Sequence, residues 1–252
     1  EKLAYPLGSF EIITQALVDR LQAGGADLRL NQEVTRLVAD PEDAQRVTGL
    51  VTGTETLPFD VVIATVPGYN LLEIAPPSIE GPYADQLRSV RYQAALVLLM
   101  VSQQSLSRIY WMNIADRTMP FVGVIEHTNY VPPSVYQGKH LIYVSNYLER
   151  DDARFRMDAG ELFALYEPHL KQINPSFGGD WIEDMHVLRA EAGQPVITRN
   201  YSQRIPDYRT PLQGLYLANT LQIYPEDRGV NYSVRLGQTI SRIVGDDLGN
   251  ET

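Results

Sequence analysis

The spacing of apolar residues divides the chain into a helical start, a strand-rich middle and an end in which a strand leads into a helix. Near the start, apolar residues recur at helical spacing, namely Phe10, Ile13, Leu17 and Leu21. Ser9 precedes them as a candidate N-cap, and the pair of glycines at 24 and 25 is typical of a helix end. The pattern therefore predicts a helix between these signals.

Extended segments follow this helix. Residues 28–30, 33–39 and 46–52 are short apolar stretches separated by turn residues, which is typical of strands. The segment 60–65 contains the continuous apolar run 61–64, and Pro67 follows as a strand end. Such a run predicts a strand in a sheet covered on both faces.

The middle of the chain, residues 69–204, alternates apolar with polar residues and is rich in tyrosine. This alternation predicts an antiparallel or mixed set of strands at 90–101, 109–113, 121–127, 141–147 and 181–188. Asp158 and Glu161 form a capping-box pattern before a helix, and Pro168 is expected to kink or restart that helix. The tyrosines fit either a partly polar pocket or a sheet edge.

The end of the chain combines a short strand with a helix that has one bare face. Residues 215–218 form an apolar run that predicts a strand buried on both faces, and a helix is expected to begin near Gly229. Small residues recur every four positions along this helix, namely Gly229, Ser233, Gly237 and Ser241. This face fits close packing on a sheet, or a flat ligand held near the unpaired N–H groups of the helix start. Residues 246–252 are expected to form a frayed tail.

Composition excludes several classes of function. The 252 residues are 44% hydrophobic, carry a net charge of −10 and contain no cysteine. An acidic chain without a run of Lys and Arg is not expected to bind nucleic acid. The longest apolar run, 94–101, is too short to cross a bilayer. The absence of Cys excludes disulfides and thiolate chemistry, and we expect a cytoplasmic protein with a small-molecule substrate.

No familiar catalytic motif is present, so catalytic residues remain unknown. Four histidines, at 127, 140, 169 and 186, lack metal-ligand spacing, and we expect no metal site. The chain has no Gly-x-Ser-x-Gly elbow and no phosphate loop. It also contains no Gly-x-Gly, the turn that holds the pyrophosphate of a dinucleotide.

Two motifs near the end nevertheless resemble a known family. The strand 215–218 continues into Asn219-Thr220, and Arg228-Gly229-Val230-Asn231-Tyr232-Ser233 follows, with Gly237 beyond. The segment resembles the C-terminal flavin-contacting motif of the FAD-dependent amine oxidase and protoporphyrinogen oxidase superfamily. The family usually has Gly and an acid where this chain has Asn219-Thr220. Gly8-Ser9, the strand at 34–37 and the strand at 60–67 resemble a further nucleotide-domain segment of that superfamily.

The resemblance implies an FAD cofactor and a set of residues that contact it. They are Val34, Ala64, Pro67, Asn219, Thr220, Arg228, Gly229, Val230, Asn231 and Ser233. In the family the Gly-x-Gly motif lies at the N-terminus. We therefore expect this chain to be the remainder of an enzyme whose first FAD-binding segment is missing, and to bind little FAD alone.

The expected fold is α/β, or α+β, with a mixed-sheet substrate domain and helices plus remnants of a Rossmann-like FAD-binding domain. We expect an FAD-domain segment over 1–68, a substrate domain over 69–205 and a flavin-contacting strand and helix over 206–252. Candidate substrate-binding residues, chosen by side-chain type, are Tyr92, His127, Tyr143, Asn146, Arg189 and Tyr224.

Two alternatives to the oxidoreductase remain. One is a flavin-dependent isomerase like UDP-galactopyranose mutase, in which Arg199, Arg204 and Arg209 would bind a sugar diphosphate. The other is a non-enzymatic binding domain.

Overall fold

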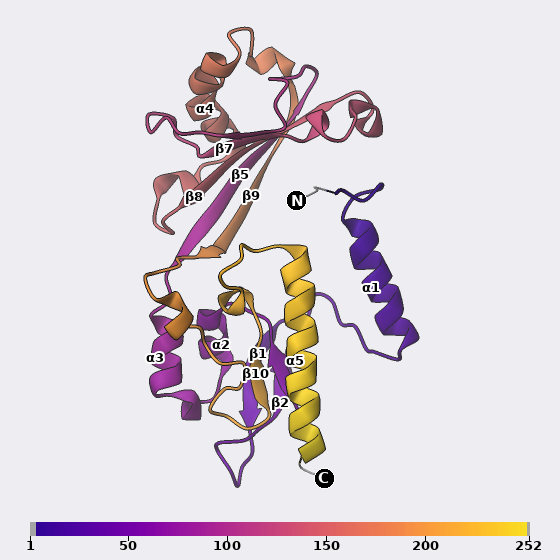
Figure 1. Cartoon of the computed structure of the whole chain (residues 1–252), viewed down its shortest axis with the longest axis vertical. Coiled ribbons are helices and arrows are strands. Elements are labelled where there is room, and N and C mark those ends of the chain that lie inside the picture. The colour runs from indigo at the N-terminus through magenta and orange to yellow at the C-terminus, as the bar shows by residue number, and fades with distance from the viewer. Residues whose placement is uncertain (1–3, 251–252) are drawn as a thin grey trace. The chain divides into compact units, whose positions relative to one another are not determined.

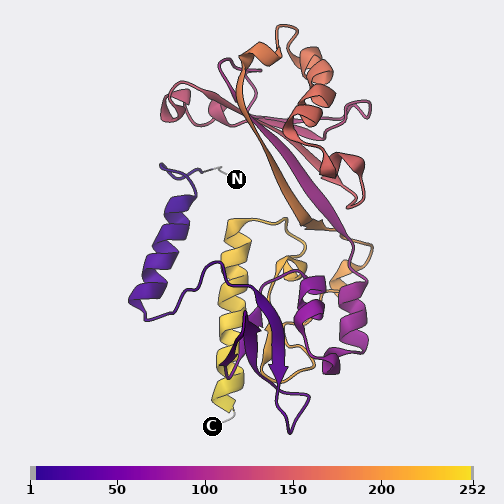
Figure 2. The same ribbon diagram turned by 180° about the vertical axis from the view of Figure 1, so that it is seen from behind.

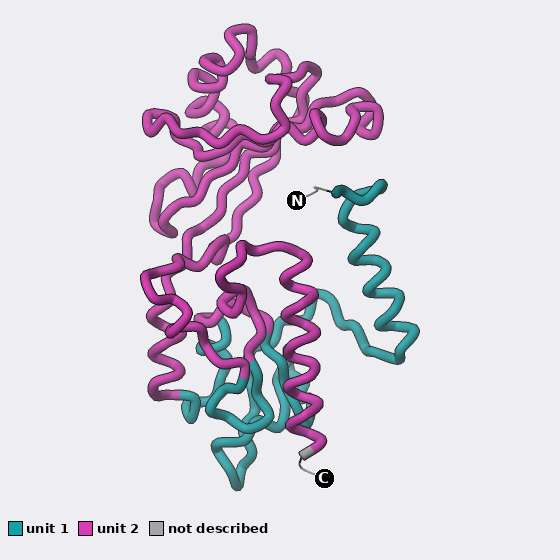
Figure 3. Tube along the Cα trace, viewed as in Figure 1, with its two compact units in different colours: residues 1–64, 70–79, 209–216 teal, residues 65–69, 80–208, 217–252 magenta. Residues whose placement is uncertain are grey.

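A computed structural model describes residues 4–250 of the chain, which form two compact units (Figure 3). Unit 1 contains the residues up to 64 together with 70–79 and 209–216. Unit 2 contains 65–69, 80–208 and the residues from 217 onward. Both units are built from segments that are distant in sequence. The functional boundaries expected at 68 and 205 stay predictions.

Unit 1 begins with the predicted helix, α1, which spans Glu11–Ala23. The N-cap is Phe10 rather than the predicted Ser9. Ser9 has a φ of 81°, outside the extended region that N-cap residues adopt, although its hydroxyl still accepts a hydrogen bond from the N–H of Glu11 at 3.2 Å. No residue of α1 is buried, so the helical spacing of its apolar side chains produces an exposed stripe.

The sheet of unit 1 is an antiparallel meander of β1 (Val34–Ala39), β2 (Val47–Thr52) and β3 (Glu55–Pro58). A separate pair joins β4 (Val62–Ala64) to β10 (Leu215–Leu217). All three residues of β10 are buried, as predicted. The expectation of a strand covered on both faces at 60–65 is wrong, because β4 has only three residues and Ile63 is 39% exposed.

Two short helices follow β4 along the chain, and the spacing of apolar residues did not predict them. They are α2 (Gly68–Ile74) and α3 (Pro82–Arg88). Each has only seven residues, which is too short for an apolar repeat to stand out. Pro82 lies at the start of α3, where its missing N–H costs no helical hydrogen bond.

Unit 2 is dominated by a five-stranded sheet with the order β6-β7-β8-β5-β9. The strands are β5 (Tyr92–Ser102), β6 (Trp111–Asn113), β7 (Gly123–Glu126), β8 (His140–Leu148) and β9 (Ile182–Pro195). Every neighbouring pair is antiparallel. The five predicted strands are therefore confirmed, although β9 continues seven residues beyond 188.

The main core lies on one face of this sheet, beneath helix α4 (Ala159–Ile173). Even-numbered residues of β5 point into the core and odd-numbered ones do not, as the strict burial alternation of that strand shows. Leu96, Leu98 and Met100 pack there with Tyr166 and Leu170 of the helix. Figures 1 and 2 show α4 along that face from opposite sides.

The predicted capping box of α4 is present. The side chain of Asp158 accepts from the N–H of Glu161 at 2.9 Å, and the Glu161 carboxylate accepts from the N–H of Asp158 at 2.9 Å. The helix does not restart at Pro168, which lies within its span. Packing of Leu162, Tyr166 and Leu170 in the core supports the helix on both sides of the proline.

The last helix, α5, spans Val230–Asn250 and begins one residue after Gly229. Ile240 and Val244 are buried, whereas Val230 and Val234 near its start are half exposed. The expected frayed tail is wrong for 246–250, which continue the helix. Residues 251 and 252 lie outside the described residues.

Candidate functional site

Two segments of unit 2 are joined by the side chain of Asn219. Its Nδ2 donates to the carbonyl of Val66 at 2.7 Å, which links the segment 65–69 to the residues after β10. Its Oδ1 accepts from the N–H of Leu221 at 2.9 Å and so caps the short 3-10 helix Thr220–Gln222. Gln222 completes the capping box by accepting from the N–H of Asn219. Both the Nδ2 and the Oδ1 of Asn219 thus have a hydrogen-bond partner within the chain.

Tyr92, the first residue of β5, holds the same segment from another side. Its hydroxyl accepts a hydrogen bond from the N–H of Gly68 at 3.4 Å, and its ring packs edge-on against Tyr69 at 5.6 Å between centroids. Burial raises the pKa of the Tyr92 phenol, so the hydroxyl stays protonated at neutral pH. Tyr92 therefore offers a neutral hydroxyl at this place.

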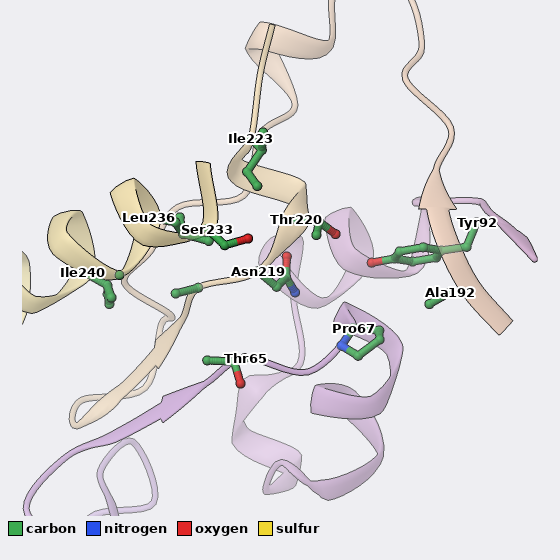
Figure 4. Close-up of a pocket in the computed structure, with 12 residues that line it drawn as sticks. Thr65, Pro67, Tyr92, Ala192, Asn219, Thr220, Ile223, Ser233, Leu236 and Ile240 are labelled. Atoms are coloured by element: carbon green, nitrogen blue, oxygen red, sulfur yellow. The ribbon is translucent and has the colours of Figure 1, made fainter. Parts of the chain in front are cut away.

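A cavity of about 370 Å³ lies between these segments and α5 (Figure 4). Its lining is Thr65, Pro67, Tyr92, Ala192, Ala218, Asn219, Thr220, Ile223, Ser233, Leu236, Gly237 and Ile240. Apolar groups dominate, and the polar ones are hydroxyls and one amide. The lining contains no Asp, Glu, His, Lys or Arg. It can bind and orient an uncharged planar group, but it offers no acid or base that titrates near neutral pH.

The helix wall of the cavity is made by the small residues of α5. A Cβ added at Gly237 would meet no atom within 4 Å, so this part of the wall is open space. The hydroxyl of Ser233 donates to the carbonyl of Gly229 at 3.2 Å and lies beside the cavity in Figure 4. Two members of the predicted small-residue stripe, Ser233 and Gly237, therefore line a cavity rather than a close helix contact.

The cavity brings together part of the predicted cofactor set. Pro67, Asn219, Thr220 and Ser233 line it. The lining does not include Arg228, Gly229, Val230 or Asn231, which lie just before or at the start of α5. Val34 begins β1 and Ala64 ends β4, both in unit 1. Their contact with a cofactor stays a prediction.

Several lining residues are not among those that the sequence predicts to bind a ligand. Thr65 is the last residue of the predicted strand 60–65 and Gly237 belongs to the small-residue stripe, so both had a local signal. Ala192 and Ile223 had none. Ala192 lies near the end of β9, in the part of that strand that the sequence pattern did not predict.

The predicted substrate residues do not form one site. Tyr92 lines the cavity, whereas Tyr143 and Asn146 lie on opposite faces of β8. Asn146 is buried on the α4 side and donates to the carbonyl of Pro120. Arg189 lies on the same side, because it pairs with Leu96 in the sheet register, and its Nε donates to the carbonyl of Phe155 at 2.7 Å. Asn146 and Arg189 therefore bind backbone carbonyls on the α4 side of the sheet.

His127 and Tyr224 occupy two further places in unit 2. The Nε2 of His127 lies 2.8 Å from the hydroxyl of Tyr136, and its ring lies 6.4 Å from that of Tyr143. Burial lowers the pKa of His127, which favours the neutral imidazole. Tyr224 lines a second cavity of about 270 Å³ and packs against the ring of Tyr201.

The three arginines that the mutase alternative invokes, Arg199, Arg204 and Arg209, are all exposed. Within residues 4–250, no group of three or more His, Asp or Glu side chains is placed to hold a metal ion. The helices of that same range include none with the length and apolar character needed to span a membrane.

Comparison with protein families gives one match. The model of the family described as flavin containing amine oxidoreductase matches residues 5–223, which is well over half of the chain. A comparison with curated proteins finds none that matches.

Solved structures share the fold at low sequence identity. A candidate protoporphyrinogen oxidase from Exiguobacterium sp. 255-15 matches with a TM-score of 0.69 and 15% identity, over 91% of this chain and 50% of its own. A reduced UDP-galactopyranose mutase matches with a TM-score of 0.68 and 17% identity, over 84% and 45%. An oxidoreductase from Methanosarcina mazei matches with a TM-score of 0.62 and 18% identity, over 85% and 49%.

These likenesses establish the α/β fold of the chain and not its activity. The chain spans about half the length of the solved structures that it matches.

Proposed function

The chain belongs to the family of flavin containing amine oxidoreductases, and from this premise we propose that it forms the substrate-binding and C-terminal flavin-contacting part of an FAD-dependent oxidoreductase of the amine oxidase and protoporphyrinogen oxidase type. The observation that carries the proposal is the cavity between Pro67, Thr220 and the small residues of α5. Its lining includes Asn219 and Thr220 from the first of the two motifs that resemble the flavin-contacting segment of this superfamily, and Ser233 and Gly237 from the second.

The cavity suits the ring system of a flavin in size and in chemistry. A volume of about 370 Å³ is at the lower end of the range for small-molecule sites, which fits one ring system rather than a whole dinucleotide. The open space at Gly237 and the apolar side chains of Leu236 and Ile240 fit a flat ring. Hydroxyls of Thr65, Thr220 and Ser233 provide polar partners for its edge.

A bound flavin would supply the redox chemistry by accepting a hydride from the substrate. The chain would supply orientation and exclude water. Apolar side chains from α5 and Ile223 shield the cavity, and Tyr92 and Asn219 fix the segment 65–69 that forms its other wall. A lining without titratable carboxylates or imidazoles suits a reaction in which the cofactor carries the chemistry.

The proposal is tested by filling the cavity from α5. Gly237→Leu places a side chain into the open space, whereas Gly245→Leu is a matched control two turns along the same helix, outside the cavity lining. A Cβ meets nothing within 4 Å at either position, so both variants are expected to fold. We expect Gly237→Leu to weaken riboflavin binding at least about tenfold and Gly245→Leu to leave it unchanged, as measured by quenching of flavin fluorescence.

Equal riboflavin binding by both variants, or no riboflavin binding by the unmodified chain, would contradict the proposal. Circular dichroism and thermal unfolding of each variant verify that a loss of binding is not a loss of fold.

A flavin-dependent isomerase is the second candidate, because the solved mutase matches the fold as well as the oxidase does. An oxidoreductase ends the reaction with a changed flavin and an isomerase does not. Loss of the oxidised flavin spectrum on anaerobic addition of substrate, reversed by an acceptor, would support the oxidoreductase. Turnover of a nucleotide sugar only after reduction by dithionite would support the isomerase. Flavin binding with neither activity would support a binding domain.

A further inference from the structure

The five-stranded sheet of unit 2 has a second face, which does not contribute to the α4 core. We call it the open face and define it by Val97, Leu99, Tyr143, Tyr147 and Leu188. The register pairs Leu99 with Tyr143 and Val97 with Leu188, so these side chains are neighbours. Leu188 is 51% exposed and Tyr147 is 40% exposed. The open face therefore carries an apolar and aromatic group of side chains, together with the polar residues Ser145 and His186, which pair with Val97 and Leu99.

One guanidinium lies at the edge of the open face. The Nη2 of Arg228 donates to the hydroxyl of Tyr147 and to the Oε1 of Gln194, each at 3.0 Å. Gln194 pairs with Gln93, and Tyr147 pairs with Ala95 two residues further along β5, which places both partners on the open face. The guanidinium carbon lies 5.8 Å from the centre of the Tyr147 ring.

The charge of Arg228 is not neutralised within the described part of the chain. Four other arginines of unit 2 form ion pairs with carboxylates, namely Arg88, Arg91, Arg150 and Arg154. Among residues 4–250, no carboxylate oxygen lies within 4 Å of the Arg228 guanidinium. Its sequence neighbours Glu226 and Asp227 are exposed, and Asp227 accepts instead from the backbone N–H of Arg228.

The hydrogen-bonding capacity of Arg228 is also unfilled. A guanidinium has five N–H donors, and the two bonds to Tyr147 and Gln194 use two of them. Its Nε is buried and has no partner among the described residues. A buried charged donor without an acceptor costs free energy, which an incoming acceptor would recover. Both partners present are neutral, so the arrangement lacks an anion.

We propose that Arg228 determines substrate specificity by binding an oxyanion, a carboxylate or a phosphate, of a substrate whose apolar body lies on the open face. Guanidinium groups bind such oxyanions through paired hydrogen bonds, and Tyr147 and Gln194 hold this one in a fixed orientation. Arg228 precedes α5 by two residues, and α5 forms a wall of the proposed flavin cavity. That the bound oxyanion belongs to a substrate rests on the proposed function. The anion site itself requires no flavin.

The test uses three probes that share one apolar ring system, and it is made without flavin. Binding of 2-naphthoate, 2-naphthyl phosphate and neutral 2-naphthamide to the 252-residue chain is measured by isothermal titration calorimetry. We expect at least one anion to bind about tenfold to a hundredfold more tightly than the amide. The tighter of the two anions distinguishes a carboxylate substrate from a phosphate substrate.

Variants then test whether the preference for an anionic probe over the neutral amide depends on Arg228. Arg228→Gln is expected to bind anion and amide equally, and Arg228→Lys to keep only part of the preference because a lysine cannot form the paired contact. Arg91→Gln is the matched control, since it removes the same charge from an exposed arginine of unit 2 that pairs with Glu149. It is expected to keep the full preference.

An anion preference that survives in Arg228→Gln, an equal loss in Arg91→Gln, or the lack of any preference in the unmodified chain would each overturn the proposal. Thermal unfolding of Arg228→Gln separates loss of the site from loss of fold. The cavity test with riboflavin is independent, so a failed flavin site and a failed anion site give different results.

Discussion

Some side-chain hydrogen bonds of this protein can be predicted from nearby sequence, and others cannot. The capping box of Asp158 and Glu161 could be predicted because its two members are three residues apart. The partners of Arg228 could not, because Tyr147 and Gln194 are 81 and 34 residues away and only the fold brings them together. Asn219 illustrates the same limit. The family resemblance implies a flavin contact for Asn219, which stays a prediction, but no local signal predicted the bonds of its amide to the backbone of Val66 and Leu221.

His127 gives a prediction at the scale of one residue. Burial lowers the pKa of its imidazole from the ordinary value of 6.5. Well above pH 6.5 the imidazole is neutral in both the folded and the unfolded chain, so His127 does not make the folding stability depend on pH there. As the pH falls below 6.5, the unfolded chain takes up the proton first, and folding stability is lost until the folded pKa is passed.

We therefore expect the free energy of unfolding to fall less steeply in His127→Gln than in the unmodified chain between about pH 7.5 and pH 5.5. His186→Gln is the control, because His186 is exposed. Urea unfolding at several pH values measures the difference. Identical pH dependence of the unmodified chain and His127→Gln would show that burial does not shift this group.

Secondary-structure elements were more predictable than their contacts. The five strands of unit 2 follow from alternation, because one face of each packs on α4 and the other does not. The end of β9 was missed since 189–195 contains Arg189, Glu191 and Gly193, which weaken an apolar pattern. The Ser9 cap failed because backbone conformation, rather than residue type, decides where a helix begins.

Gly193 gives a prediction at the scale of the strand pair. A Cβ at this position would lie 2.6 Å from both the backbone N and the Cβ of Ala95, where the register of β5 and β9 shifts. Gly193→Ala is therefore expected to lower the free energy of unfolding by about 1–3 kcal/mol, because the strands must separate locally. Chemical denaturation measures this change.

The control for the strand pair is a glycine with free space. Gly245→Ala in α5 meets no neighbour and replaces a poor helix former, so it is expected to raise stability by about 0.5–1 kcal/mol. A neutral Gly193→Ala would contradict the close approach of the two strands.

At the scale of the whole chain, the sequence indicated the family but not how its segments assemble. The cavity of unit 2 collects residues from 65–67, 92, 192 and 218–240. Such contacts across long separations depend on tertiary packing, which local periodicity does not encode. The family could be identified from the sequence because its motif residues lie in two short segments. Residues 217–220 follow one strand, and residues 228–237 form the start of one helix.

The absence of a Gly-x-Gly turn leads to the final prediction, which concerns the two halves of FAD. The cavity can hold the ring system, but the 252 residues contain no Gly-x-Gly to hold a pyrophosphate. A single helix terminus contributes only about 0.3–1 kcal/mol to the binding of an anion. FAD is therefore expected to bind this chain less than about fivefold more tightly than riboflavin.

Parallel fluorescence titrations with riboflavin and FAD measure this ratio directly. Protein purified from cells is expected to be colourless, because a flavin held by its ring system alone would dissociate during purification. Stoichiometric yellow FAD after purification, or a preference for FAD above about a hundredfold, would mean that these residues hold the pyrophosphate by contacts other than a glycine-rich turn. Addition of ADP distinguishes a chain that binds the pyrophosphate of FAD from one that binds only its ring system. Only the first would lose FAD to ADP by competition.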